Sequence, residues 1–342
     1  MFAFPNKIQL ARLPTPLEPL RNLSREWGVD LRVKRDDLTG TELTGNKIRK
    51  LEYLLAEALD RDCDTVVTCG AVTSNHARAT SIAARRLGLD THLILAGDLP
   101  AVADGNLQLE LLVGAAVRYI SRKEYALDID RILHETADEL KHEEKNPYII
   151  PTGGSNATGL IGYVEAVREM RDQCTHDHWQ PDFLACAVGS GGTYAGLFLG
   201  NELFPLAETV LGVLVCATAD YFTQKIIADV RTAAQLYHWD VPLEERKIRL
   251  AEGYIAGGYA QTNSDQLRFI RHVAQQEAII LDPVYTGKAL FGVYREIEAG
   301  RIPKGSKILF IHTGGIYGLS AYAEEMTREW GSVEQWGDEQ KE

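Results

Sequence analysis

One pattern recurs along the chain and limits what it can fold into. A short apolar run is followed by Gly or polar residues and then by apolar residues at helical spacing. Residues 65–69, for example, precede Gly70 and a helical segment that opens near Ser74. Repeated strand–turn–helix units of this kind build parallel sheets covered by helices. The pattern therefore predicts an α/β protein.

The apolar runs fall into two groups, which predict two domains. Strands are expected at 31–34, 65–69, 92–96, 115–120, 148–150, 183–188, 210–216, 278–281 and 307–312. Helices are expected at 48–58, from near 74, at 106–112, 128–141 and 163–170, and from 194. Each domain should hold a mostly parallel, open twisted sheet flanked by helices. We expect a large domain from 1–46 and 162–342, a small domain from 47–161, and a site between them at the carboxyl ends of strands.

Charge and cysteine usage narrow the classes of function. The 342 residues include 36 Lys and Arg against 48 Asp and Glu, a net charge of −12, and this negative field repels nucleic acid. The five cysteines are scattered without a C-x-x-C pair, so neither a disulfide framework nor a zinc site is indicated. No secretory signal and no apolar stretch of membrane-spanning length is found. A cytoplasmic protein without nucleic-acid or membrane partners is expected.

A glycine-rich turn gives the strongest indication of a phosphate site. It follows a buried strand and consists of Gly189, Ser190, Gly191, Gly192 and Thr193. Successive backbone N–H groups there can converge on an anion at a helix N-terminus, although a plain tight turn is the alternative. The dinucleotide pattern G-x-G-x-x-G fails at Tyr194, and no P-loop is present. A compact monophosphate is favoured over a pyrophosphate.

Two lysines crowd the start of a predicted helix. Lys47 and Lys50 lie one turn apart on one face, with Arg49 between them. A solvated charged face is the alternative explanation. Cations normally favour the last turn of a helix, however, and such a local conflict is typical of functional sites.

Ser74, Asn75 and His76 open the helix that follows the strand at 65–69. Ser74 is a suitable N-cap, and the same geometry presents N–H groups and a hydroxyl to a carboxylate. None of the nine histidines has the spacing of a metal site.

Two further segments, 282–288 and 312–315, follow apolar runs and should lie at strand ends. Tyr285 lies in the first, and Tyr259 precedes it in the sequence. Either tyrosine could be a core residue with a satisfied hydroxyl. To move protons near neutrality, its phenol would need a lowered pKa.

Taken together and in this order, the motifs resemble the pyridoxal-phosphate enzymes of the tryptophan synthase β-subunit superfamily (fold type II). Within it the chain is similar to D-cysteine desulfhydrase and 1-aminocyclopropane-1-carboxylate deaminase. The similarity covers nearly the whole chain. It runs through residues 14–18, 34–37, 45–52, 74–76, 153–155, 189–193, 282–288 and 312–315.

The resemblance implies a role for each candidate residue. Lys47 matches the lysine that bonds to pyridoxal 5'-phosphate, and the cofactor would lie in the cleft between the domains, held mainly by the large one. Its phosphate would be held by Lys50 and the turn 189–193. Asn75 would bond the ring hydroxyl oxygen, and Thr313 would face the pyridine nitrogen. Ser74, Asn75 and His76 would receive the carboxylate of a small amino-acid substrate, with Tyr259 and Tyr285 lining its site. Homodimers are usual in the family.

One position bears on the substrate. The similar deaminases carry Glu after the second tyrosine, where it can lie beside the pyridine nitrogen, whereas this chain has Thr286 as the desulfhydrases do. A neutral partner weakens ring protonation and the electron sink, which favours β-elimination over opening of a cyclopropane. Thr73 replaces the Gln expected in many relatives, which leaves the substrate preference open.

The leading hypothesis is therefore β-elimination from D-cysteine to pyruvate, ammonia and hydrogen sulfide. Deamination of the cyclopropane amino acid to 2-oxobutyrate and ammonia is the main alternative. Elimination from L-cysteate, D-serine or β-chloro-D-alanine is also open. From other classes, a nucleotide-dependent oxidoreductase and a non-catalytic, cofactor-binding sensor are the alternatives.

Overall fold

The computed structural model describes residues 3–98 and 100–331. Its strands are β1 (Leu17–Pro19), β2 (Asp30–Lys34), β3 (Thr65–Ala71), β4 (Asp90–Ala96), β5 (Ala116–Ile120), β6 (Pro147–Ile149), β7 (Phe183–Val188), β8 (Thr209–Leu214), β9 (Arg249–Ala251) and β10 (Lys307–Ile311). Its α-helices are α1 (Arg21–Trp27), α2 (Lys47–Asp60), α3 (Asn75–Arg86), α4 (Gly105–Leu112), α5 (Arg122–His142), α6 (Ile161–His176), α7 (Gly192–Leu203), α8 (Ala219–Leu236), α9 (Ser264–Glu277), α10 (Thr286–Glu298) and α11 (Ala323–Trp330).

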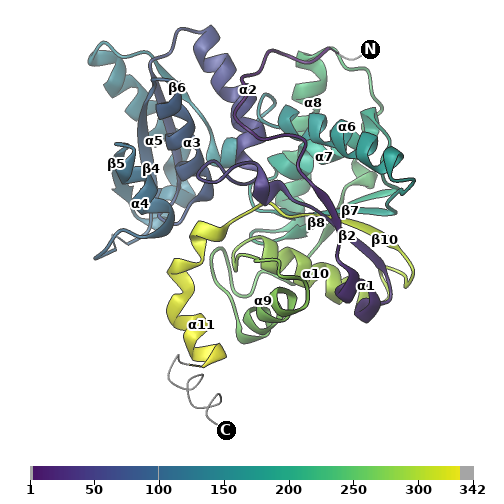
Figure 1. The fold of residues 1–342 in the computed structure, drawn as a ribbon. Coiled ribbons are helices and arrows are strands. Elements are labelled where there is room, and N and C mark those ends of the chain that lie inside the picture. Colours follow the sequence, from purple (N-terminus) through teal and green to yellow (C-terminus); the bar gives the residue numbers. More distant parts are fainter. Residues whose placement is uncertain (1–2, 99, 332–342) are drawn as a thin grey trace.

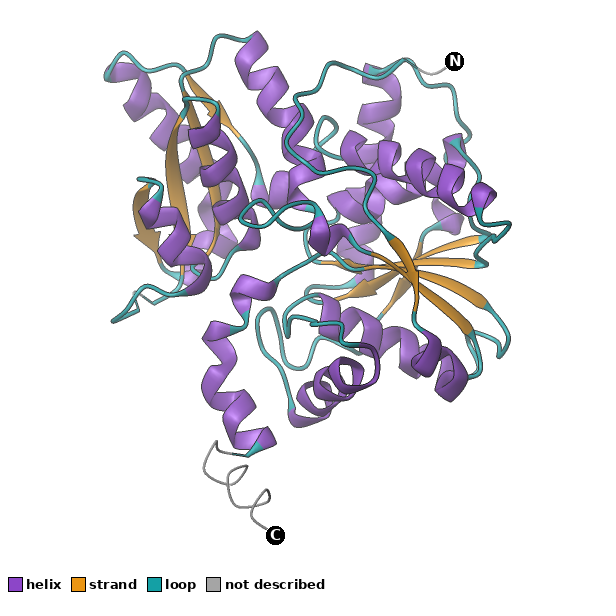
Figure 2. Ribbon diagram, in the orientation of Figure 1, coloured by secondary structure: helices purple, strands orange, loops and turns teal. Residues whose placement is uncertain are grey.

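The strands form two separate sheets (Figures 1 and 2). The larger has the order β1-β2-β10-β7-β8-β9 and is parallel except for the short edge strand β1. The smaller has the order β5-β4-β3-β6 and is entirely parallel. Helices flank both sheets, so the predicted fold class is confirmed. The exact domain boundaries remain a prediction.

The larger sheet has an apolar core on each face. Side chains alternate along β10, so that Leu309 and Ile311 join the core beneath α6, α7 and α8, whereas Ile308 and Phe310 join the core against α1, α9 and α10. All four are almost completely buried. A strand covered on both faces reads as a continuous apolar run, which explains why these strands were recognisable in the sequence.

The smaller sheet follows the same rule. On β3, Val66 packs with the core of α2 and α3, while Val67 and Cys69 pack against α5. Both faces are again covered, and residues at and after the carboxyl ends of β3 and β4 line a pocket together with the turn after β7. The loops that follow these strands are therefore the segments that can meet residues of the other sheet.

One predicted strand is wrong. Residues 278–281 form no strand, although Ile279 and Leu281 are buried in the core beneath the larger sheet. Ala278 ends α9 in the left-handed conformation, with φ 54°. The neighbouring strand β10 is already paired on both sides, by β2 and β7, so the segment has no free edge to join. It packs as irregular chain: Ala278 N donates to Ala274 O at 2.9 Å, and the Ile280 carbonyl oxygen lies 3.0 Å from His312 Nε2.

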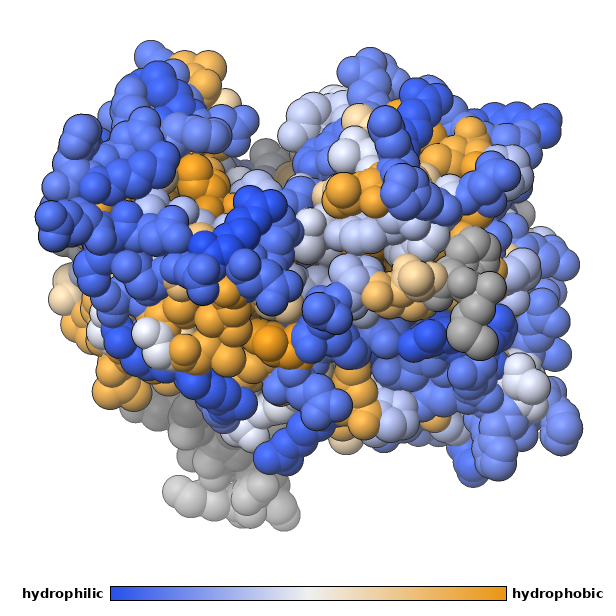
Figure 3. Space-filling view, turned by 90° about the horizontal axis from the view of Figure 1, so that it is seen from above, coloured by the Kyte–Doolittle hydropathy of each residue, from blue (hydrophilic) through white to orange (hydrophobic). Residues whose placement is uncertain are grey.

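One face of the molecule shows how polar and apolar residues are distributed on the surface. Seen from above, polar residues cover most of the face and apolar residues gather in smaller patches (Figure 3). None of the described helices is long and apolar enough to cross a membrane.

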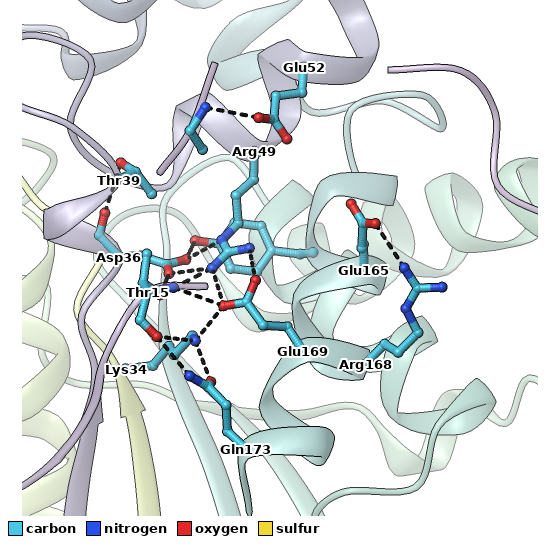
Figure 4. A network of polar contacts seen from close by, with 12 residues as sticks. Thr15, Lys34, Asp36, Thr39, Arg49, Glu52, Glu165, Arg168, Glu169 and Gln173 are labelled. Atoms are coloured by element: carbon cyan, nitrogen blue, oxygen red, sulfur yellow. Dashed lines mark hydrogen bonds and ion pairs between the residues drawn. The ribbon is translucent and has the colours of Figure 1, made fainter. Parts of the chain in front are cut away.

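A buried ion cluster joins α2 to the larger sheet and to α6 (Figure 4). Arg49 bonds both oxygens of Asp36, at 2.9 and 2.8 Å, and both oxygens of Glu169, at 2.9 and 3.0 Å. Thr15 and Tyr163 also donate to Asp36, at 2.7 and 2.6 Å. Burial alone would raise the pKa of Asp36. The nearby Arg49 guanidinium and the other hydrogen-bond donors lower this pKa by more, so the carboxylate stays charged. The cluster holds the first turn of α2 from two sides.

Arg49→Met is expected to lower the free energy of unfolding by about 3–5 kcal/mol, because it leaves the buried Asp36 carboxylate without its ion-pair partner, whereas Glu169 keeps Lys34. Urea unfolding followed by circular dichroism measures the change. Arg131→Met is the matched control, since Arg131 pairs with Glu135 on the exposed face of α5, and such a pair contributes less than about 1 kcal/mol. An equal effect of the two substitutions would contradict this account of the cluster.

Candidate active site

Lys47 begins α2 at the junction of the two sheets. The preceding backbone lies against the loop that follows β10: Asn46 N donates to the carbonyl oxygen of Thr313 at 3.1 Å. Gly45 has φ +99°, and a Cβ there would lie 2.7 Å from the same oxygen, so only glycine fits. The Asn46 side chain donates to Thr193 Oγ1 at 2.9 Å. These contacts bring the lysine, the glycine-rich turn and Thr313 to one point, as the motifs predicted.

The amine of Lys47 is chemically unusual. Burial lowers its pKa to about 8, and the nearby Asp282 carboxylate only partly opposes this. A neutral amine is therefore well populated near neutrality, and neutral amines act as nucleophiles and bases.

The glycine-rich turn forms an open cradle at the start of α7. No side chain caps this helix, and Gly191 takes φ +86°. A Cβ at Gly192 would lie 2.8 Å from Lys50 Nζ and 2.6 Å from Ser155 Oγ, so the space is available only to glycine. Lys50 is 1% exposed and donates to Gly153 O and Ser155 Oγ, both at 3.1 Å. A helix N-terminus backed by a lysine is suited to an anion.

The segment 74–76 opens α3 on the opposite side. Ser74 Oγ caps the helix by accepting from Ala77 N at 3.2 Å, and Ser74 and Asn75 line the same pocket as Lys47. The first N–H groups of a helix have no partner within it, so they are available to a carboxylate.

The ring of His76 is arranged differently from the rest of this segment. Thr68 Oγ1 donates to Ile150 O at 2.8 Å, so it accepts from His76 Nε2, which is 2.9 Å away. Burial, together with Lys47 and Lys50, holds the pKa of His76 well below its usual value. The ring is thus neutral, and its Nδ1 is an acceptor with no hydrogen-bond partner in the described structure. Only the backbone N–H of His76 is suited to a carboxylate.

Two tyrosines of the candidate site, Tyr259 and Tyr285, contact each other. The hydroxyls of Tyr259 and Tyr285 are 2.6 Å apart, and their rings cross edge to face at 6.1 Å. Loss of hydration raises the pKa of Tyr259 to about 12 and holds that of Tyr285 well above its usual value. Both phenols therefore keep their protons at neutral pH, and one hydroxyl donates to the other.

Thr286 does not lie where the substrate argument placed it. It is completely buried and is not among the residues that line the pocket. Its hydroxyl donates to Asp282 Oδ1 at 2.7 Å and accepts from Asp282 N at 2.8 Å. The Thr286 side chain closes the turn before α10, whereas Thr313 lines the pocket.

One pocket of about 740 Å³ lies between the sheets. It is lined by Lys47, Ser74, Asn75, His76, Gly189, Ser190, Gly191, Thr193, Tyr259, Tyr285 and Thr313. Lys50 and Gly192 lie directly behind its wall. The predicted site residues are therefore brought together, although their roles remain to be tested.

Two residues around this pocket were not among the candidates predicted from the sequence. Tyr125 lines it from α5, with its hydroxyl 3.0 Å from Thr152 Oγ1. Lys288, fully buried on α10, donates to the carbonyl oxygens of Ile255 and Gly258, at 2.8 and 2.9 Å, and so fixes the loop that carries Tyr259. Lys288 lies within the segment 282–288 that the sequence singled out, whereas nothing in the sequence distinguished Tyr125.

Comparison with known proteins identifies the family. The family model described as "Pyridoxal-phosphate dependent enzyme" matches residues 8–314. The chain belongs to this family of pyridoxal-phosphate-dependent enzymes. The predicted resemblance and cofactor are confirmed, and the nucleotide-dependent oxidoreductase is no longer supported.

Individual relatives of this pyridoxal-phosphate enzyme are similar over most of their length. A putative 1-aminocyclopropane-1-carboxylate deaminase from Pyrococcus abyssi is 42% identical, over 94% of each chain. A bifunctional D-cysteine desulfhydrase/1-aminocyclopropane-1-carboxylate deaminase, mitochondrial, from Arabidopsis thaliana is 42% identical, over 93% of this chain and 80% of its own. The crystal structure of an ACC deaminase homologue superposes with a TM-score of 0.87 at 40% identity, over 95% of this chain and 96% of its own.

The residues present fit pyridoxal phosphate. The turn has no room for side chains, since a Cβ would lie 2.9 Å from the Tyr285 ring at Gly189 and 2.8 Å from Lys50 Nζ at Gly192. Bare backbone at a helix N-terminus beside a lysine suits a phosphate. The amine of Lys47 has a pKa suited to bonding with an aldehyde. Both features belong to the same pocket.

The low pKa of Lys47 gives a prediction for the apoenzyme. Reductive methylation with formaldehyde and cyanoborohydride, read by peptide mass spectrometry at a series of pH values, should modify Lys47 with a midpoint near pH 8. A lowered pKa frees the amine at lower pH, because only the neutral form attacks. Exposed Lys123 on α5 serves as the internal reference. A midpoint for Lys47 near 10.5, the ordinary lysine value, would refute the prediction.

Proposed function

We propose that this enzyme catalyses β-elimination from D-cysteine, or a closely related small amino acid, to pyruvate, ammonia and hydrogen sulfide. The observation that carries the proposal is the neutral inner wall of the pocket. Thr313 lines it where the sequence argument places the pyridine nitrogen. The pocket's carboxylates, Asp98, Asp104 and Glu325, lie instead on the loop before α4 and on α11.

A neutral partner for the pyridine nitrogen determines which reaction is favoured. When bound, pyridoxal phosphate supplies an electron sink for negative charge at the substrate's Cα. A hydroxyl supports ring protonation less than a carboxylate does, so the sink is weaker. Loss of a leaving group such as thiolate from Cβ needs weaker electron withdrawal by the cofactor than breaking a carbon–carbon bond does. A weaker electron sink therefore favours elimination.

The chain's own residues supply the remaining functions in this proposal. Lys47 binds the cofactor and, once released by the substrate, removes the Cα proton with its amine. Lys50 and the turn 189–193 hold the phosphate. Ser74, with the N–H groups at the start of α3, receives the substrate's carboxylate, and Asn75 binds an oxygen of the cofactor. The paired hydroxyls of Tyr259 and Tyr285 donate hydrogen bonds and pass protons to the product side.

The assembly and location complete the proposal. We infer a homodimer from the resemblance to the family, which light scattering coupled to size-exclusion chromatography would test. A reducing, cytoplasmic location is supported by the five cysteines, which are all free and of which four are buried.

Product analysis tests the substrate. Purified enzyme should release sulfide and pyruvate in equal amounts from D-cysteine, and Lys47→Ala should lower that rate by at least a thousandfold, because a general base and the covalent attachment are lost together. L-cysteine and the cyclopropane amino acid run alongside. 2-Oxobutyrate without sulfide would overturn D-cysteine in favour of deamination. A yellow protein inert toward all these substrates, L-cysteate and D-serine would favour a sensor.

A further inference from the structure

A buried polar pair lies beneath the turn that opens α3. Arg78 on α3 and Asn106 on α4 are 0% and 2% exposed. Arg78 Nε donates to Asn106 Oδ1 at 2.8 Å, and the other guanidinium nitrogens donate to the carbonyl oxygens of Thr44, at 3.0 Å, and Glu42. Arg78 forms no ion pair with any described carboxylate, so hydrogen bonds to neutral oxygens satisfy it. Burying a charge in this way is costly, which suggests a function for the pair.

The chemistry of the pair determines the direction of each hydrogen bond. Burial lowers the pKa of Arg78 to about 10, so it is still charged at neutral pH, and a guanidinium only donates. The atom of Asn106 that faces it must therefore be the carbonyl oxygen. The amide nitrogen of Asn106 then points the other way, where it donates to Thr73 O at 2.8 Å and to Asn75 Oδ1 at 3.0 Å.

The orientation of the Asn106 amide in turn fixes the amide of Asn75, which lines the pocket. The Oδ1 of Asn75 accepts a hydrogen bond from Asn106, so the Nδ2 of Asn75 points away from Asn106. No described residue accepts a hydrogen bond from this nitrogen. The amide is therefore held with its donor free for a ligand.

We propose that Arg78 and Asn106 are positioning residues that fix Asn75 as a hydrogen-bond donor to the pocket. This part of the site consequently selects an oxygen anion and rejects a donor. The inference rests on the proposed function, in which two such anions are at hand: the phenolic oxygen of the cofactor and the carboxylate of the substrate. Thr73 is held by the same amide, so the turn and the side chain are oriented together.

Asn106→Asp tests the relay with little change in size. The new carboxylate still accepts from Arg78, but it presents an oxygen to Asn75 Oδ1. Two acceptors repel each other, so the Asn75 amide turns over and presents its oxygen to the pocket. Gln108→Glu is the matched control, since it makes the same amide-to-acid change on the exposed face of α4.

Two measurements on the holoenzyme distinguish the two anions. If Asn75 donates to the phenolic oxygen, the pH at which the absorbance band of the bound cofactor shifts should rise by about one unit in Asn106→Asp, because a donated hydrogen bond favours the anionic oxygen. If Asn75 donates to the substrate, KM should rise about tenfold while the band is unchanged. An unchanged band and an unchanged KM, in a variant with wild-type thermal unfolding, would overturn the proposal.

A double-substitution cycle tests that the relay acts through Asn75. Asn106→Asp should change neither quantity further in an Asn75→Ala background, whereas independent, additive changes would show that Asn106 does not act through Asn75. The absorbance titration needs no turnover. It therefore stays decisive for the relay even if D-cysteine proves not to be the substrate.

Discussion

The double pairing of Arg49 with Asp36 and Glu169 is the interaction on which the rest of the site depends. Arg49 lies two residues after Lys47, Asp36 follows β2 of the larger sheet, and Glu169 lies on α6. A guanidinium that holds two carboxylates in a fixed fork leaves α2 little freedom to rotate or slide. Because α2 also packs on the smaller sheet, the cluster sets the position of the lysine between both sheets.

Close backbone contacts bring the strand ends of the larger sheet to the start of α2, where they form the wall of the pocket. The chain after β10 touches the chain before α2 at Gly45, and the turn after β7 touches the Tyr285 ring at Gly189. Strand ends of the larger sheet thus converge on the start of α2, while the ends of β3 and its neighbours face them. The enclosed amine of Lys47 loses hydration and forms no ion pair with a described residue, so burial lowers its pKa although the Asp282 carboxylate opposes the shift.

Elements whose formation depends on local sequence pattern could be predicted. Elements and side-chain orientations that depend on tertiary contacts could not. Apolar runs such as 183–188 were identified because both of their faces are buried, whereas the three-residue edge strand β9 carries too little signal. Residues 278–281 have a strand's composition but no free edge to pair with. The start of α5 at Arg122 was missed despite a readable capping box, in which Ser121 and Glu124 bond each other's backbone. Most of the residues that the family motifs predicted lie around one pocket, but the orientation of His76 and Thr286 depends on hydrogen bonds that no motif encodes.

The central claim is that this fold delivers one particular lysine to the cofactor. Borohydride reduction of the holoenzyme, followed by protease digestion and mass spectrometry of the peptides, tests it directly, because reduction fixes the cofactor to the amine it occupies. The account predicts a single pyridoxyl phosphate group on Lys47. Attachment to Lys50 or Lys288, or a yellow protein with no lysine modified after reduction, would contradict it.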